Sequence, residues 1–306
     1  MSIWQFKSLS TLVNEEFQLS LDEGSTDLDE VDFDDLKIFI KREDQNPNGS
    51  FKDRSIAFMM SRYFEEGIND FTISSSGNAA ISAANYSKLN NFKLTIFVSE
   101  NLKGEKRDII NNIDQNFDNV GVQFVKRPKS DAIKYSRENN SKLLRASDDD
   151  LAVSGYKTIS YELADENPDI DAIFIPTSSA TSTVGIYEGY KELGIHPPEI
   201  HIVQTEKIHP IAKEFDKNFS ETTASIANCV VDRVAKRKAQ VMKILEETGG
   251  SGWVVSDDLI RNALEITQEI GIENDSPNSH LSLAGFIKAF KEGRDFENPC
   301  LIFSGI

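Results

Sequence analysis

Runs of branched and aromatic residues alternate along the whole chain with segments of helical periodicity, and this alternation constrains the fold more than any other feature. The apolar runs have the length of buried strands, whereas the segments between them repeat apolar residues three and four positions apart. Such a pattern is typical of βαβ units, in which parallel strands are joined by helices. The sequence therefore predicts an α/β fold of open, twisted, mostly parallel sheets with helices on both faces.

The predicted elements can be placed along the chain from these periods. Strands are predicted at 36–40, 70–75, 93–98, 120–125, 172–176, 199–204 and 300–305. Helices are predicted at 53–66, 78–89, 129–139, 153–165, 183–193, 256–270 and 279–292. In the helix at 256–270, Ser256 is suited to cap the first turn and Gly271 to end the last one.

The length of 306 residues favours two domains of ordinary size over a single core. The polar stretch SDDD at 147–150 is the best candidate for a break. We therefore expect an N-terminal α/β domain at 1–150 and a C-terminal α/β domain at 151–306, with the first ~40 residues able to pack on the other domain.

The net charge of −17 limits the partners that the chain can have. Such a field repels nucleic-acid backbones and anionic lipid, so neither is an expected partner. The acidic stretch at 27–36 is expected to be a solvated surface loop. Cys229 and Cys300 lack metal-ligand spacing, which predicts neither a zinc site nor a disulfide. Without an apolar leader or a membrane span, the chain is expected to be cytoplasmic.

Lys52 stands in an unusual local sequence, NPNGSFKDR at 46–54. The residues 46–49 form turns and Ser50 can cap a helix, so Lys52 falls in the first helical turn. The positive end of the helix dipole disfavours an ammonium there, which suits an amine that must react as a nucleophile. The alternative is an ordinary exposed charged turn.

Two hydroxyl-rich turns each follow a predicted strand and precede a predicted helix. ISSSGNAAISAA at 73–84 is the first, and IPTSSATSTVGIYEGYKELG at 175–194 is the second. Amides and hydroxyls at a helix start can bind an anion, and ligands of open α/β sheets bind at the carboxyl ends of strands. Either turn alone could also be a simple polar cap.

In this order, the Lys52 motif, SSSGN and PTSSATST resemble the pyridoxal-phosphate enzymes of the tryptophan synthase β type (fold type II), and most closely the threonine synthases. The likeness extends over nearly the whole chain. LDEGSTDL at 21–28 is similar to the family's EGNTPL, SGYKTISYEL at 154–163 to its GQKT helix, and EGYKELG at 188–194 to the helix after its phosphate loop.

The resemblance implies pyridoxal 5'-phosphate as the cofactor, in the cleft between the two domains, and a role for each matching residue. Lys52 would be the catalytic residue that forms the Schiff base and moves protons between substrate carbons. Asn78 would bond the ring hydroxyl, and Ser304 would face the pyridine nitrogen, which a hydroxyl leaves largely unprotonated. The implied phosphate loop is Ser178, Ser179, Ala180, Thr181, Ser182 and Thr183. The implied substrate-binding positions are Ser75, Ser76, Gly77 and Ser147.

The resemblance also implies a small amino-acid substrate and a homodimer, as is the habit of the family. For a threonine synthase the reaction is that of O-phospho-L-homoserine and water to L-threonine and phosphate, a carbon–oxygen lyase reaction. The chain departs from the family where that phosphate is bound, because only Ser147 persists and Ala146, Asp149 and Ala152 stand at the other positions of the motif. The carboxylates at 148–150 should also oppose a phosphorylated substrate. A lost charged hydrogen bond costs about 1.5–3 kcal/mol.

Two other hypotheses therefore stay open. One is a threonine or serine dehydratase-like enzyme, or a β-replacing enzyme of the cysteine or cysteate synthase kind, acting on an unphosphorylated amino acid. The other is a non-catalytic binding or regulatory protein that keeps the fold. The phosphate loop also lacks the family's glycines, and residues with a Cβ resist positive φ. The histidines 196, 201, 209 and 280 are expected at the surface or in loops, and His280 is the one nearest the expected site.

Overall fold

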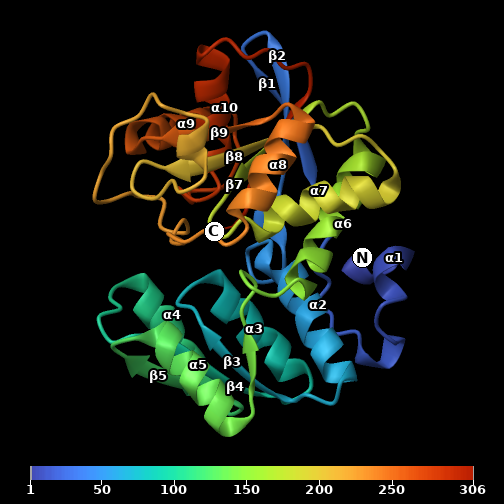
Figure 1. Ribbon diagram of the computed structural model, residues 1–306, viewed down its shortest axis with the longest axis vertical. Helices are drawn as coiled ribbons and strands as arrows, with labels where there is room; N and C mark the ends of the chain where they lie inside the picture. The colour runs from blue at the N-terminus through green and yellow to red at the C-terminus, as the bar shows by residue number, and fades with distance from the viewer. Residues whose placement is uncertain (1, 306) are drawn as a thin grey trace. The chain divides into compact units, whose positions relative to one another are not determined.

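The computed structural model describes residues 2–305 and divides into two compact units, each built from two segments of the chain. The N-terminal unit is Met1–Gly24 with Lys52–Gly155, and the C-terminal unit is Ser25–Phe51 with Tyr156–Ile306. Each unit holds one sheet (Figure 1). The predicted α/β class is confirmed. The domain boundary expected at residue 150 stays a prediction. By packing, residues 25–51 belong to the same unit as the C-terminal segment.

The sheet of the N-terminal unit is parallel throughout, in the order β5-β4-β3-β6. Its strands are β3 (Asp70–Ser74), β4 (Lys93–Ser99), β5 (Val120–Val125) and β6 (Lys142–Leu144). Its helices are α1 (Lys7–Ser10), α2 (Lys52–Glu65), α3 (Asn78–Leu89), α4 (Glu105–Asn116) and α5 (Pro128–Asn139). Right-handed crossovers place α3 and α4 on one face, because β3, β4 and β5 progress in one direction, and α5 on the other, because β6 lies back beyond β3.

The sheet of the C-terminal unit has the order β1-β2-β10-β7-β8-β9, with only β1 antiparallel to its neighbour. Its strands are β1 (Leu28–Phe33), β2 (Leu36–Lys41), β7 (Ala172–Pro176), β8 (Glu199–Thr205), β9 (Ser251–Val255) and β10 (Pro299–Ile302). Its helices are α7 (Thr181–Leu193), α8 (Lys238–Thr248), α9 (Asp257–Glu269) and α10 (Leu281–Lys291), and α6 (Leu151–Glu166) crosses the division between the units. The same handedness rule puts α7 and α8 opposite α9 and α10.

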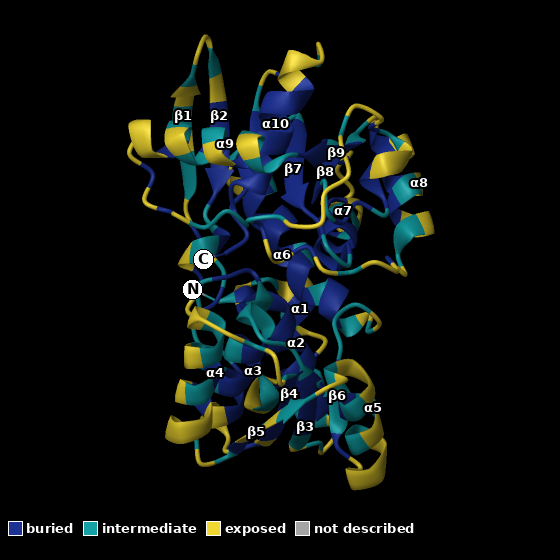
Figure 2. Cartoon of the chain, turned by 90° about the vertical axis from the view of Figure 1, so that its left-hand side faces the viewer, coloured by how far each residue is buried: buried dark blue, intermediate teal, exposed yellow. Residues whose placement is uncertain are grey.

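Burial follows the apolar runs. In Figure 2 the strands β7 and β8 and the helix α10 are almost wholly buried, as expected for a strand and a helix covered on both sides. Helix α9 is only partly buried, but both of its ends are well defined. The Ser256 hydroxyl accepts the Leu259 N–H at 3.2 Å, and Gly271 follows the last turn with φ +77°. Both predicted ends of this helix are confirmed.

All seven predicted strands and all seven predicted helices exist in the structure, with ends within three residues of the expected ones. Six elements were missed: β1, β6, β9, α1, α4 and α8. The expectation of a loop at 27–36 is wrong, because 28–33 pairs with β2 around a turn at Asp34 and Asp35. The acidic residues do face solvent there, while Val31 and Phe33 pack on the core of this unit.

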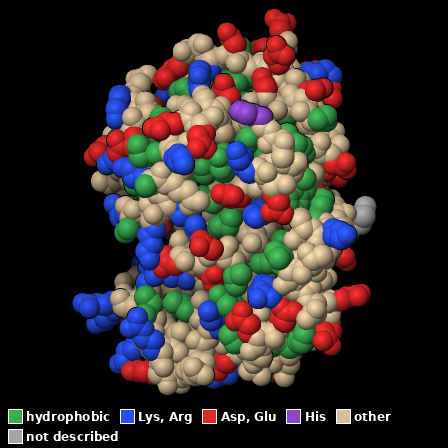
Figure 3. Space-filling view, turned by 45° about the vertical axis from the view of Figure 1, so that its right-hand side comes forward, with side chains coloured by type: hydrophobic (Ala, Val, Ile, Leu, Met, Phe, Trp, Pro, Cys, Tyr) green, Lys and Arg blue, Asp and Glu red, His purple; other side chains and the backbone are tan. Residues whose placement is uncertain are grey.

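The remaining short elements are 3-10 turns, at Ile3–Gln5, Glu15–Phe17, Glu43–Gln45 and Ala212–Glu214. No helix within residues 2–305 is both long and apolar enough to cross a bilayer. On the face of the molecule shown in Figure 3, acidic and basic side chains both occur, so the net charge of −17 is not confined there to one acidic block.

Candidate functional site

Lys52 and Asn78 are the first residues of the helices α2 and α3, both in the N-terminal unit. The helix α2 turns through 66–69 into β3, and β3 turns through 75–77 into α3. Helix α3 packs on β3 and on α2. Asn78 therefore starts its helix at the carboxyl edge of the sheet, where ligands of open α/β sheets bind, and Lys52 starts the helix that packs on α3.

The SSSGN turn keeps its helix start open. Gly77 precedes α3 in an extended conformation, and no side chain caps the first turn. The Ser75 hydroxyl accepts the Gly77 N–H at 3.3 Å, which tightens the turn. Ser75, Ser76 and Gly77 are half-buried. The turn therefore presents hydroxyls and helix-start amides at one edge, as an anion requires.

Ser147 lies in the turn that follows β6, the neighbouring strand of the same sheet. In the parallel pair β3–β6, Ile73 is opposite Leu144, so the turns that follow these strands begin side by side. The structure thus brings Ser75 and Ser76 close to the stretch that holds Ser147. The same register places Arg145 there, a residue that the sequence argument had not considered.

The acidic residues after Ser147 are partly neutralised by local contacts. Arg145 forms an ion pair with Asp148 at 2.7 Å. Asp149 accepts the Leu151 N–H at 3.0 Å and the hydroxyl proton of Tyr63. Burial, followed by Asp149, raises the pKa of Tyr63, so this phenol stays a donor. The expected repulsion between the carboxylates and an anionic substrate is therefore weaker than the sequence alone suggested.

In the C-terminal unit, the predicted phosphate loop opens α7 directly after β7. Ala180 precedes the helix with φ +66° and ψ +13°, and it contributes no capping side chain. A left-handed conformation costs a residue with a Cβ about 1–2 kcal/mol. The loop thus keeps a left-handed position although alanine occupies it. The first bond of the helix runs from Val184 N–H to the Ala180 carbonyl, so the amides before Val184 have no acceptor within the helix.

Hydroxyls of this loop remain able to donate. Ser178 Oγ accepts the N–H groups of Val231 and Asp232 at 3.0 and 3.2 Å. Both acceptor positions of that oxygen are thereby used, and its own proton is left to give away. Ser182 is buried, and its hydroxyl makes no hydrogen bond with any residue in the part of the chain that the structure describes. Uncapped amides and donor hydroxyls together suit a phosphate monoester.

Other hydroxyls of the loop form hydrogen bonds with one another. The Thr183 hydroxyl lies 3.1 Å from that of Thr177, and the Ser179 hydroxyl lies 3.1 Å from that of Thr181. These pairs hold the side chains of Thr183 and Ser179 toward their neighbours. Ser178 and Ser182 are therefore the better placed of the predicted residues to meet a ligand.

Ser304 follows β10, the strand beside β7. Leu301 is opposite Phe174, so Ser304 leaves the sheet next to the turn that holds Ser178. The Ser304 carbonyl accepts the Phe51 N–H at 3.2 Å, and only 6% of Ser304 is exposed. Phe51 is the residue directly before Lys52 in the chain. A main-chain hydrogen bond therefore joins Ser304, the predicted partner of the pyridine nitrogen, to Phe51, the residue before the predicted catalytic Lys52.

The histidines are not surface residues as a group. His201 is completely buried in β8, which contradicts the surface or loop expectation for it. His280 does lie in the turn before α10, as that expectation allows, but it is completely buried as well. Burial is the main cause that lowers the pKa of each ring. His280 Nδ1 lies 2.8 Å from the Ser276 carbonyl, its Nε2 lies 2.6 Å from the Thr267 hydroxyl, and its ring packs against Phe303. We conclude that it supports the segment that ends at Ser304.

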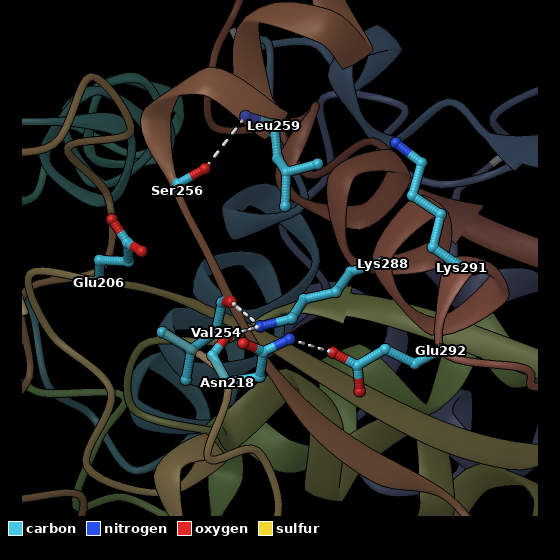
Figure 4. A pocket seen from close by; sticks show the side chains of 8 residues that line it. All are labelled: Glu206, Asn218, Val254, Ser256, Leu259, Lys288, Lys291 and Glu292. Carbon is cyan, nitrogen blue, oxygen red and sulfur yellow. Dashed lines mark hydrogen bonds between the residues drawn. The ribbon is translucent and has the colours of Figure 1, made fainter. Parts of the chain in front are cut away.

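A pocket of 340 Å³ lies at the ends of β8 and β9 in the C-terminal unit (Figure 4). Its charges largely satisfy one another. Lys288 Nζ lies 2.6 Å from Asp216 and donates to the carbonyls of Asn218 and Val254, and Asn218 donates to Glu292. Among residues 2–305, no group of three or more His, Cys, Asp or Glu side chains could hold a metal ion.

Comparison with known proteins agrees with this architecture. Residues 19–305 match the family described as "Pyridoxal-phosphate dependent enzyme". The chain therefore belongs to the pyridoxal-phosphate-dependent enzymes, and the predicted cofactor is confirmed at the level of the family. The predicted fold type II is confirmed as well.

Three proteins that are similar to this chain are named for three different activities. The chain is 25% identical to the threonine synthase of Methanocaldococcus jannaschii, over 98% of this chain and 79% of that protein. It is 29% identical to the biosynthetic L-threonine dehydratase of Pasteurella multocida, over 56% of this chain and 33% of that protein. Maize serine racemase has the same fold, with a TM-score of 0.78 and 18% identity over 98% of this chain and 94% of that one.

Proposed function

We propose that this chain catalyses elimination or replacement at the β or γ carbon of a small amino acid, and that its leading reaction is that of a threonine synthase: O-phospho-L-homoserine and water to L-threonine and phosphate. The observation that carries the proposal is Lys52, which starts the helix packed on α3 and directly follows the residue bonded to Ser304. The likeness to threonine synthases over nearly the whole chain supports the reaction class.

Each residue of the candidate site has a proposed task. Pyridoxal phosphate, when bound, supplies an electron sink for the substrate's α carbon. The Lys52 amine would hold the cofactor through its aldehyde, and would then take the Cα proton and return a proton at a neighbouring carbon. The Ser304 hydroxyl would bond the pyridine nitrogen, and Asn78 the ring hydroxyl. The amides at the start of α7, with Ser178 and Ser182, would hold the phosphate.

Arg145 is the residue that favours an anionic substrate. It is 38% exposed in its side chain, follows β6 beside the Ser75–Gly77 turn, and pairs with a single carboxylate among residues 2–305. A guanidinium has five donor hydrogens, so one carboxylate does not exhaust it. We therefore propose that Arg145 supplies the cation that Ala152 does not, and that Ser75, Ser76, Gly77 and Ser147 bind the substrate with it.

The dehydratase alternative has its own support. Ala146 and Ala152 offer no polar group to a phosphate, and the Pasteurella multocida relative that is 29% identical is a threonine dehydratase. Under this alternative the substrate is an unphosphorylated serine-like or threonine-like amino acid, and the product is an oxo acid with ammonia. A non-catalytic protein would bind amino acids and release neither product.

The cofactor assignment is tested by loading purified protein with pyridoxal phosphate, reducing it with borohydride and mapping the modified peptide. We expect the label on the peptide that contains Lys52. Lys52→Ala should keep the circular dichroism spectrum of the parent and lose turnover. A label elsewhere, or full activity in this variant, would overturn the assignment.

Substrate choice is tested on the loaded enzyme by measuring phosphate release from O-phosphohomoserine and oxo-acid release from serine and threonine. Arg145→Ala should raise KM for the phosphorylated substrate by about tenfold or more, since a hydrogen bond to a charged group contributes about 1.5–3 kcal/mol. Arg127→Ala is the control, because Arg127 precedes α5 in the same unit. Oxo-acid release without phosphate release would establish the dehydratase alternative.

A further inference from the structure

The end of the described chain is held by one buried hydroxyl. Ser279 is completely buried in the turn before α10. Its Oγ donates to the Gly305 carbonyl at 2.6 Å and accepts the Gly305 N–H at 3.0 Å. Both polar groups of the Gly305 main chain therefore depend on a single side chain.

The bonds of Ser279 complete a set of contacts that fixes residues 303–305. The Phe303 N–H donates to the Lys41 carbonyl at 3.0 Å. The Ser304 carbonyl accepts from Phe51, and Gly305 pairs with Ser50 in an antiparallel bridge. The segment 303–305 is thus pinned by β2 and residues 50–51 on one side and by Ser279 on the other.

The turn that carries Ser279 is itself rigid. The Ser282 hydroxyl donates to the Ser279 carbonyl at 2.9 Å, and His280 is held at both ring nitrogens. An anchor of this kind fixes the position of the main chain that it binds. Nothing in the packing of the sheet requires a hydroxyl here, since β10 ends at Ile302.

We infer that Ser279 is a positioning residue for Ser304 and for the main chain that leads into Lys52; this rests on the proposed function. By fixing the Gly305 peptide, it sets the direction of the Ser304 hydroxyl toward the pyridine nitrogen. Through the pairing of 304–305 with 50–51, the same anchor holds the residue before Lys52. Loss of the hydroxyl would leave two buried main-chain groups without their partner and let the segment move.

Ser279→Ala tests this inference, with Ser87→Ala as the matched control, because both serines are completely buried and donate to a main-chain carbonyl, while the bond of Ser87 stays within α3. The first measurement is hydrogen exchange of the C-terminal peptide in protein without cofactor. The second is the dissociation constant of pyridoxal phosphate, with the absorption spectrum of the bound cofactor. Thermal denaturation of both variants sets a temperature at which each is folded.

In Ser279→Ala we expect faster exchange of the C-terminal peptide, about tenfold weaker binding of pyridoxal phosphate and a shifted spectrum. Ser87→Ala should stay within about twofold of the parent. Unchanged binding and spectrum in Ser279→Ala, or equal losses in both variants, would overturn the positioning role. If the parent protein itself bound no pyridoxal phosphate, the proposed function would fail, while the exchange data would still report whether Ser279 anchors the segment.

Discussion

Replacing Lys288 by methionine should destabilise the C-terminal unit more than any other single change of a charged residue near the pocket of Figure 4. The Lys288 side chain is 9% exposed and that of its partner Asp216 is 1% exposed. The ammonium lies 2.6 Å from Asp216, which also accepts the N–H groups of Val254 and Asn218. The pair thus joins the irregular segment after 215 to β9.

The magnitude follows from what methionine leaves behind. Its apolar chain fills much of the same volume, but Asp216 becomes a buried carboxylate without a cation, and two carbonyls lose their donor. Removing one partner of a buried pair costs about 3–5 kcal/mol. For a domain of ordinary size, this loss in the free energy of unfolding corresponds to a fall in Tm of about 6–20 °C.

Lys291 provides the control on the same helix. It lines the same pocket in the last turn of α10 but is exposed, so Lys291→Met should change stability by less than about 0.5 kcal/mol. Urea unfolding can be followed by the fluorescence of Trp253, which lies in β9 beside Val254, in a Trp4→Phe background. Adding Asp216→Asn to Lys288→Met should recover part of the loss, because the unpaired charge is then gone. Equal stability of the two lysine variants would refute the reasoning.

Three further predictions concern other parts of the chain. Burial lowers the pKa of His280 below its usual 6.5, so on acidification the unfolded chain takes up the proton first and stability should fall as the pH drops below about 6.5. The urea midpoint of His280→Gln should therefore depend less on pH over that range. An unchanged pH dependence of the midpoint would contradict this. A Cβ at Gly155 would lie 2.2 Å from the Arg54 carbonyl, so Gly155→Ala should cost about 3 kcal/mol in thermal denaturation, while Gly121→Ala, which meets nothing within 4 Å, should be nearly neutral. Burial raises the pKa of Cys300 to about 12 whereas Cys229 is exposed, so a thiol reagent should modify one cysteine in the native protein and two after denaturation; two fast thiols in the native state would be the contrary result.

Strong apolar periods were enough to predict the central elements of both sheets. The run at 172–176 is β7 from end to end, and Ser256 caps α9 as its position suggested. Such elements are determined locally, since a buried strand needs a continuous apolar run and a helix start needs an acceptor for its free amides. The missed elements lack those signals. The helix α4 buries only two isoleucines, and β1 alternates with carboxylates at the edge of a sheet.

In the candidate site, too, some features could be predicted from the sequence and others depend on tertiary contacts. A turn rich in hydroxyls at the start of a helix can be recognised in the sequence, because amides and hydroxyls close together in the chain form the anion site. Whether each hydroxyl is available depends on residues far away: Ser178 accepts from Val231 and Asp232, more than fifty positions later. The left-handed conformation of Ala180 also could not be predicted from its identity, since alanine rarely adopts it.

The sequence by itself determined the α/β class and, to within two residues, the starts of the helices α2, α3 and α7, because these depend on short-range periodicity and on a few adjacent positions. The cofactor followed from the resemblance of its motifs to a known family. Only the tertiary structure decided that Arg145 lies beside the SSSGN turn, that Ser279 anchors Gly305 and that the main chain of Phe51 pairs with Ser304. Those contacts join residues that are distant in the chain, and strand order and register bring them together.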